Sequence, residues 1–392
     1  MKLTKYMCAA FAAAIALASC QKQDTPATPE KGELKAVTVS LSNVVPVAKS
    51  VSTAQLAETS AVITNYQVFF SNEDGSQFYK GKNADGTDAA HYNTAVTAPV
   101  TFHYLDAAVK KVYVIANFGS EQNPENVTAL EALVRTVASQ QEDKLNELAL
   151  YGKTETLTET GSHTDTHPAT KVYAASVTVK PMVARVEVNT FGVSFAKNAL
   201  FNSVRFDKLA FDNYFPEALV NGTVSGERVR QEFVNYNDAA QLKAAQKTYF
   251  DGLQGTSWFA DLVDASLTES GVQDVKVTRP NANAQTVDTK LDGHHYAYHF
   301  FPAANATDFS KDGYPRLYAQ VTSTDVQGNE AVQYVMTKNL KADDAVITNF
   351  EAGKIYRINY TFPDTLLENP LICADVTVTV APWTVVAVTP EW

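Results

Sequence analysis

Apolar and polar residues alternate along much of this chain, as is typical of β-strands. Val37, Val39 and Leu41 are apolar, with Thr38 and Ser40 between them, which predicts a half-buried strand. The same kind of pattern predicts further strands at residues 62–71, 98–104, 111–117, 171–179, 203–211, 296–301, 316–323, 331–336, 354–361 and 375–380, and one that opens at Val183. The chain is therefore expected to be mainly β.

Two segments carry a helical spacing instead. Leu130, Leu133, Val134 and Val137 recur at intervals of three and four residues, which predicts a helical region over residues 126–150. A shorter helical stretch is expected at 238–246, inside the long, turn-rich segment 212–290. We place a domain boundary near Lys180, between two groups of predicted strands.

The N-terminus has the pattern of an export signal. Lys2 and Lys5 precede a short apolar run over residues 7–18, and Leu17-Ala18-Ser19 leads into Cys20. This arrangement resembles a bacterial lipobox, in which the cysteine sulfur is acylated and residues 1–19 are removed; the alternative is an ordinary secretory signal with an incidental cysteine. A lipid on Cys20 would hold the mature chain at a membrane without a transmembrane helix. The polar residues 20–33 would then act as a tether.

Composition excludes some classes of partner. The 392 residues carry a formal net charge of −11 and contain no cluster of Lys and Arg, so a nucleic-acid partner is not expected. Of the three cysteines, Cys8 lies in the signal, Cys20 would carry lipid and Cys373 stands alone. No internal disulfide and no cofactor are expected.

The sequence gives weak support for any catalytic or metal-binding residue. His163 and His167 lie in a polar stretch that predicts an exposed loop rather than a helix that could hold a metal ion. His295 and His299 would share one face of a strand, at a distance that favours structural or surface roles. Cys373 has no neighbouring histidine and is expected to be a buried small side chain. We therefore predict no catalytic residue, no metal site and no enzymatic activity.

The C-terminal segment is unusually apolar for a chain end. Val376, Val378 and Val380 share one face of a strand, which Pro382 interrupts. Residues 384–392 follow, and their apolar side chains include those of Val385, Val386, Val388 and Trp392. An exposed strand of this kind would aggregate, so it must be buried in its own fold or in another molecule. A final core strand of its own domain is the simpler alternative.

The first predicted strand presents the complementary problem. A protease cut between Lys49 and Ser50 would release residues 20–49, and with them Val37, Val39 and Leu41. The departure of this strand would open an apolar groove between sheet edges. The C-terminal strand of another copy could fill the groove by strand addition.

At these positions the chain resembles a known family, the Bacteroidales major fimbrial subunits (FimA-type fimbrillins, the type V pilins). The resemblance rests on the lipobox at Cys20, the run Lys-Val-Tyr-Val-Ile-Ala-Asn at 111–117, Val-Ala-Arg-Val at 183–186, Lys-Ile-Tyr-Arg-Ile at 354–358 and Val-Thr-Val-Ala-Pro-Trp at 378–383. It implies two transthyretin-like β-sandwich domains, here residues 50–180 and 181–392. It also implies lipoprotein export, proteolytic loss of the first strand and polymerisation by donor-strand exchange.

One feature departs from the family. Its members are commonly cut after an arginine, whereas the first arginine of this chain is Arg135. Lys49 is the best-placed basic residue; a cut after Lys35 would leave Val37 to Leu41 in the chain.

The sequence thus predicts a subunit of a cell-surface fimbria, most simply of its stalk, that supports adhesion. The expected partners are other copies of the chain, other fimbrial subunits, the outer membrane through the lipid of the precursor, a processing protease and host surface ligands. The expected locations are the outer membrane for the precursor and the extracellular fimbrium for the mature chain. The alternatives are an anchor or tip subunit, or a surface glycan-binding lipoprotein that uses Tyr296, Tyr298, Phe300 and Phe301 as an aromatic platform.

Overall fold

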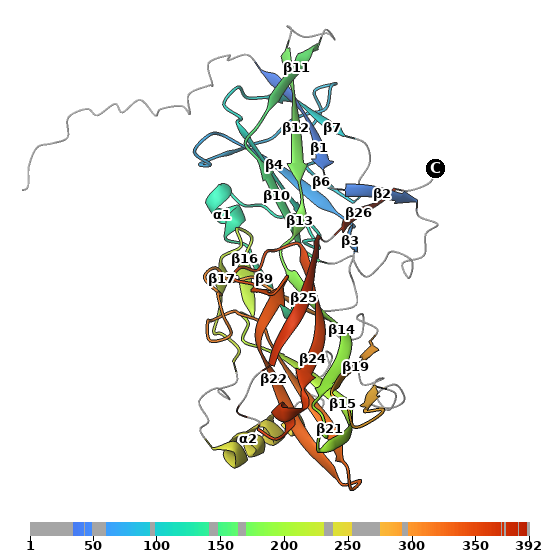
Figure 1. The fold of residues 1–392 in the computed structure, drawn as a ribbon. Helices are drawn as coiled ribbons and strands as arrows, with labels where there is room; N and C mark the ends of the chain where they lie inside the picture. Colours follow the sequence, from blue (N-terminus) through green and yellow to red (C-terminus); the bar gives the residue numbers. More distant parts are fainter. Residues whose placement is uncertain are drawn as a thin grey trace, which may run out of the picture.

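The computed structural model confirms the predicted fold class, which is mainly β with sandwich-type sheets and short helices (Figure 1). It describes residues 34–42, 44–48, 60–94, 99–140, 148–163, 170–230, 238–252, 275–291, 297–369, 371, 374–382 and 384–389. Several predictions fall outside these residues, namely those on Cys20, Lys49, Ser50, His167, His295, Tyr296, Cys373 and Trp392. No helix of the described segments is long and apolar enough to cross a membrane.

Most of the strands up to Pro181 form two sheets that share a core. Phe70 on β4 (Tyr66–Ser71) and Phe102 on β7 (Val100–Leu105) link the two sheets, because their ring centroids lie 5.0 Å apart. One sheet has the order β11 (Thr158–His163), β12 (Thr170–Thr178), β1 (Lys35–Ser42) and β7 (Val100–Leu105). The other has the order β13 (Lys180–Pro181), β10 (Leu150–Thr154), β8 (Lys111–Ala116), β4 (Tyr66–Ser71) and β5 (Phe78–Tyr79), with β6 (Tyr92–Asn93) paired to β4.

The later strands form one long sheet that folds over itself. Phe191 on β14 (Ala184–Phe195) and Phe206 on β15 (Phe201–Asp212) lie far apart in the strand order, yet their ring centroids are 4.9 Å apart across the core. The order is β18 (Lys276–Thr278), β15 (Phe201–Asp212), β21 (Arg316–Asp325), β22 (Glu330–Ala342), β25 (Ala374–Pro382), β24 (Lys354–Pro363), β14 (Ala184–Phe195) and β19 (Gln285–Lys290). In addition, β20 (Ala297–Phe300) pairs with β14 and β23 (Ala345–Val346) with β22.

Two small sheets join distant parts of the chain. In the first, β9 (Val134–Thr136) pairs with β16 (Glu217–Leu219), which pairs in turn with β17 (Val224–Ser225). This ladder connects the earlier and the later strands, and we keep the division near Lys180 as a proposal. In the second, β26 (Thr384–Thr389) lies between β2 (Val44–Ala48) and β3 (Ser60–Ile63).

The helices are α1 (Val127–Glu131), α2 (Ala239–Gly252) and the 3₁₀ helices η1 (Ala138–Gln140) and η5 (Asp364–Leu367). The predicted helix over 126–150 is wrong for the described residues between α1 and η1 and for Leu150, which begins β10. Asn126 caps α1 by accepting a hydrogen bond from the amide of Ala129, but the chain then enters β9 and pairs with β16. The second prediction is confirmed and extended, because α2 continues to Gly252.

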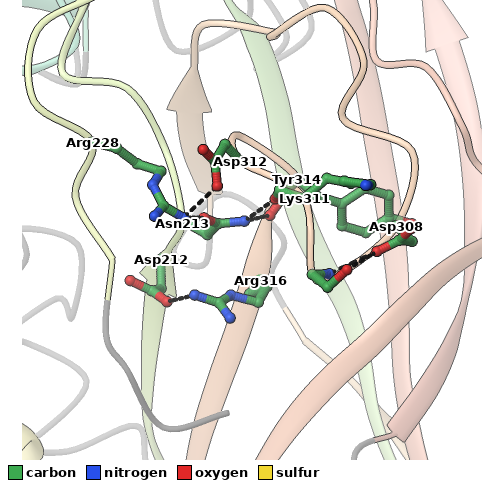
Figure 2. Close-up of polar contacts among 9 residues, drawn as sticks. Asp212, Asn213, Arg228, Asp308, Lys311, Asp312, Tyr314 and Arg316 are labelled. Carbon is green, nitrogen blue, oxygen red and sulfur yellow. Dashed lines mark hydrogen bonds and ion pairs between the residues drawn. The ribbon is translucent and has the colours of Figure 1, made fainter. Parts of the chain in front are cut away.

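A polar cluster fixes the loop between β20 and β21 (Figure 2). Asn213 has a φ of 64° directly after β15, a left-handed conformation that asparagine tolerates well. Its amide nitrogen donates to the carbonyl oxygens of Lys311 and Tyr314, at 2.6 and 2.8 Å. Its amide oxygen accepts from Arg228, which also pairs with Asp312 at 2.7 Å. One side chain thus ties the end of β15 to this loop.

A buried ion pair lies beside this cluster. The Arg316 guanidinium donates to the Asp212 carboxylate at 2.7 Å, and both side chains are fully buried (Figure 2). The pair joins the end of β15 to the start of β21 within the later sheet.

Candidate functional site

The first strand of the described chain, β1, lies in the interior of its sheet (Figure 1). It runs parallel to β12, with Lys35 opposite Lys171 and Ser42 opposite Thr178. On its other side it runs antiparallel to β7, where Val37 is opposite Phe102. Strand β1 thus supplies hydrogen-bonding groups to both neighbours, so its loss would expose two strand edges at once.

The apolar side chains of β1 enter the shared core. Val37 and Val39 are buried, and Leu41 is partly buried against the same cluster. Between them, the Thr38 hydroxyl lies 2.9 Å from that of Thr101 on β7. Beyond them, the Ser42 hydroxyl lies 2.8 Å from that of Thr178 on β12. The alternation seen in the sequence therefore describes a strand with a core face and a hydroxyl-rich face.

The burial of Lys35 was not predicted from the sequence. Its side chain is buried, and its ammonium group donates to the carbonyl oxygens of Val109 and Ala107. It also lies 5.2 Å from the centroid of the Tyr173 ring. Burial, together with the charge of Lys110, lowers the pKa of Lys35 to about 8. The spacing of Lys35 could have indicated its burial, because Lys35 is in phase with Val37, Val39 and Leu41.

This burial bears on where a protease could act. A protease needs an accessible basic side chain and a locally extended, unpaired backbone, whereas Lys35 is buried and paired on both sides. The alternative cut after Lys35 is therefore disfavoured in the folded chain. Lys49 and Ser50 lie outside the described residues, between β2 and β3.

The C-terminal strand β26 is held within its own chain. It runs parallel to β2, with Val385 opposite Val44, Val386 opposite Val45 and Val388 opposite Val47. On its other side it runs parallel to β3, where Val386 is opposite Val62. Figure 1 shows this small sheet beside the sheets of the earlier strands, with β2 in blue next to β26 in dark red.

The strand that precedes β26 has its own place in the later sheet. Strand β25 pairs parallel with β22 and antiparallel with β24, and Val376 and Val378 are buried there. It ends at Pro382, and residue 383 alone separates it from β26. The two halves of the apolar C-terminal segment are therefore parts of different sheets.

The described residues contain no group of three or more His, Cys, Asp or Glu side chains that could hold a metal ion. His299 is buried, and its Nδ1–H donates to the carbonyl oxygen of Gln140. Burial and the nearby Arg185 lower the pKa of His299 to about 3, so it is neutral at physiological pH. His299 thus has the structural role that its spacing indicates, and His163 ends strand β11.

The aromatic platform proposed for glycan binding does not form from its described members. Tyr298, Phe300 and Phe301 are at most 1 % exposed. Tyr298 stacks on Phe211 and donates its hydroxyl to the carbonyl oxygen of Leu209. These side chains are core residues, and the alternation of the 296–301 segment reflects packing.

Comparison with known proteins supports the sequence resemblance. Residues 36–203, which contain both sheets of the earlier strands except Lys35 of β1, match the model of the family described as major fimbrial subunit protein (FimA). A search of curated protein sequences finds no match to this chain.

One solved structure shares the fold over nearly its whole length. A candidate cell adhesion protein from Bacteroides eggerthii is 17 % identical, with a TM-score of 0.50, and the alignment covers 92 % of this chain and 98 % of that one. A fimbrilin (FimA) from Porphyromonas gingivalis is 14 % identical, with a TM-score of 0.46 and coverage of 89 % and 98 %. Over residues 36–203, the family match confirms the resemblance to the FimA major fimbrial subunits that the sequence indicated.

Proposed function

We propose that this chain is a structural subunit of a cell-surface fimbria that is exported as a lipoprotein, trimmed by a protease and polymerised by donor-strand exchange. The observation that carries the proposal is the position of β1. It fills the interior of a sheet, yet it lies near the start of the mature chain and before a single basic residue, Lys49. A cut there would leave a long groove between β12 and β7.

The groove would be a strong binding site for an apolar strand. Each of Val37, Val39 and Leu41 contributes about 1.5–3 kcal/mol when it is buried. A donor strand with alternating apolar side chains would recover this energy and pair with both edges. Nine residues, 384–392, span roughly 30 Å when extended. They are long enough to replace the eight residues of β1.

The full proposal assigns a role to each part of the chain. Residues 1–19 are the signal, Cys20 carries the lipid, and residues 20–49 are the removable segment. Residues 50–180 form the acceptor domain, and 181–392 form a second domain that ends in the donor. The partners are other copies of the chain and other fimbrial subunits, with the lipidated precursor at the outer membrane and host surface ligands for the finished fibre.

Replacement of Lys49 by Ala tests the processing step. Because Lys49 is the only Lys or Arg between Ala48 and Ser60, the variant should stay a soluble monomer that retains β1. The exposed Lys80, replaced by Ala in the same way, is the matched control and should assemble normally. N-terminal sequencing of subunits from wild-type fibres gives the second measurement: fibres whose subunits begin before Val37 would refute processing and indicate an anchor subunit that keeps its first strand.

A pair of cysteines tests the exchange itself. One is placed in the tail at Thr389 and the other on β7 at Thr101, whose side chain faces the position that β1 occupies in the precursor. Disulfides between neighbouring subunits of purified fibres are expected, and they should be absent when either cysteine is omitted. Bonds formed solely within single chains would return the tail to the role of a final strand in its own chain.

A further inference from the structure

The segment before Lys49 contains two strands with different partners. Strand β1 occupies the groove between β12 and β7, whereas β2 is the outer strand of the small sheet that holds β26. Residue 43 alone separates β1 from β2. Strand β1, which fills the proposed acceptor groove, is thus followed almost directly by β2, which pairs with the proposed donor strand.

We propose that β2 is an inhibitory strand for the donor, so that one cut between β2 and β3 opens the acceptor groove and frees the donor strand together. This inference rests on the proposed function and adds a regulatory step to it, namely the release of the donor strand. Before the cut, β26 is paired on both sides in its own chain and is unavailable to a neighbour. After the cut, β1 and β2 belong to one short peptide that is no longer attached to the subunit.

The architecture of the small sheet explains why β26 would then be released. Without β2, the strand keeps one parallel partner, β3, over four residue pairs. A two-stranded ladder of this size is marginal in water, and parallel pairing is slightly less stable per residue than antiparallel pairing. Release of β26 leaves the later sheet intact, because β25 stays paired between β22 and β24.

The same geometry explains why β26 stays in place before the cut. Strand β2 can pair on one side alone, since Pro46 has no N–H and confines the strand to a sheet edge. Its covalent attachment to the subunit, through β1 on one side and residues 49–59 on the other, compensates, because a tethered strand rebinds its partner at a high effective concentration. Attachment to the subunit therefore lets β2 keep the donor paired, and a cut between β2 and β3 leaves β2 attached to β1 alone, so that both strands leave together.

Two engineered cuts separate the two effects. In the precursor, a site for a sequence-specific protease is inserted either at residue 43, which frees β1 but leaves β2 attached, or within residues 52–57, which frees both strands. Release of the cut peptide is followed by mass spectrometry, with mild denaturant added to both samples until release is complete and then removed. Acceptor function is measured with a fluorescent peptide of residues 384–392, and donor function by the growth of oligomers.

Both cut proteins should bind the peptide, whereas growth of oligomers should be at least tenfold faster after the second cut. The first-cut protein should also terminate chains of the second, since it accepts a strand but offers none. Equal growth rates would overturn the inhibitory role of β2 and leave the proposed function intact. Failure of both cut proteins to bind the peptide and to grow would refute the proposed function itself.

A variant without any cut gives an independent measurement. Val45→Pro with Val47→Pro removes the two N–H groups of β2 that flank Pro46, while β1 stays in its sheet. Loss of two backbone hydrogen bonds should speed amide exchange of residues 384–389 by about tenfold or more. Exchange of β7 should be unchanged, because β1 still covers it. Unaltered exchange in β26 would show that β2 does not restrain the donor.

Discussion

Lys35 places a positive charge in phase with the apolar side chains of β1. Its ammonium group is satisfied by two carbonyl oxygens, yet its pKa is lowered from 10.5 to about 8 because the charged form is desolvated. At neutral pH, the desolvation of the Lys35 ammonium group weakens the docking of β1 in its sheet. In the proposed fibre, this weakness would favour the departure of β1, whereas Val at position 35 would not provide it.

The shifted pKa predicts a pH dependence of stability. Between about pH 8 and pH 10 the unfolded chain keeps the proton on Lys35 while the folded precursor loses it, so the free energy of unfolding should rise with pH. Below pH 8 both states are protonated and this contribution is constant. Urea unfolding at pH 7.5, 8.5 and 9.5 should show a smaller rise in Lys35→Met than in wild type. Lys80→Met, at an exposed site, is the control; the same rise in Lys35→Met as in that control would contradict the assignment.

The Asp212–Arg316 pair predicts a strong asymmetry between single and double variants. Arg316→Met leaves the fully buried carboxylate of Asp212 without this cationic partner, which should lower the free energy of unfolding by about 3–5 kcal/mol. Asp212→Leu combined with Arg316→Met removes both charges and should recover most of that loss. Denaturant titrations of the three proteins measure the difference. A double variant less stable than Arg316→Met would show that the pair contributes more than mutual neutralisation.

At the residue scale, apolar positions were predictable and polar ones were not. The positions of Val37 and Val39 in the core follow from alternation alone. Lys35 shares their phase, but its burial depends on the carbonyls of Val109 and Ala107, which come from a distant loop. The cluster around Asn213 likewise depends on partners almost 100 residues away, as its bond to Lys311 shows.

At the scale of elements, the prediction failed where local and long-range preferences compete. The spacing of Leu130, Leu133, Val134 and Val137 suits one face of a helix. After α1, however, residues 134–136 pair with β16, whose register is set by contacts more than 80 residues away. The hydrogen bonds between β9 and β16 outweigh a weak helical preference. Such long-range pairing cannot be inferred from a single sequence.

Strand β1 offers a prediction that separates precursor from fibre. Val39→Asp buries a carboxylate in the shared core and should destabilise the precursor by several kcal/mol, at the upper end of single-substitution effects. Because the substituted residue leaves with the cut peptide, fibres formed afterwards should be as stable as those of wild type. Thermal unfolding of precursor and fibre provides both measurements.

The matched control is Ser40→Asp, on the same strand but on the face that points away from the core. It should change precursor stability by much less. Fibres from Val39→Asp that melt at lower temperature than wild-type fibres would show that β1 remains in the mature subunit.

At the scale of the whole molecule, the class of fold followed from composition and alternation, whereas the pairing of β26 did not. Strands β2 and β3 lie more than 300 residues before β26, and short parallel pairings leave no local signal. The apolar pattern of the C-terminal segment predicted that it must be buried or paired. It did not indicate that its partners are β2 and β3, near the start of the same chain.

Truncation after residue 383 tests the independence of the tail from the fold. Strand β25 completes the later sheet between β22 and β24, so the truncated subunit should keep its circular dichroism spectrum and unfold cooperatively. It should bind a donor strand after processing but fail to extend a fibre, as seen by electron microscopy. Truncation after residue 373, which removes β25 as well, should unfold the later sheet; normal fibre extension by the 383 variant would refute the donor assignment.

The ladder between β9 and β16 has a mechanical consequence for a fibre in flowing liquid. In the proposed fibre, tension enters a subunit through the strands that grip a neighbour's tail and leaves through β25, in the other sheet. The backbone near Val183 is one path for this force, and the β9–β16 ladder is a second path that runs beside it. The Arg135 guanidinium, 3.8 Å from the centroid of the Phe118 ring, braces the second path against the earlier sheets. Two parallel paths resist bending and twisting at the junction, so each subunit transmits a pull as a stiff rod instead of a hinged pair.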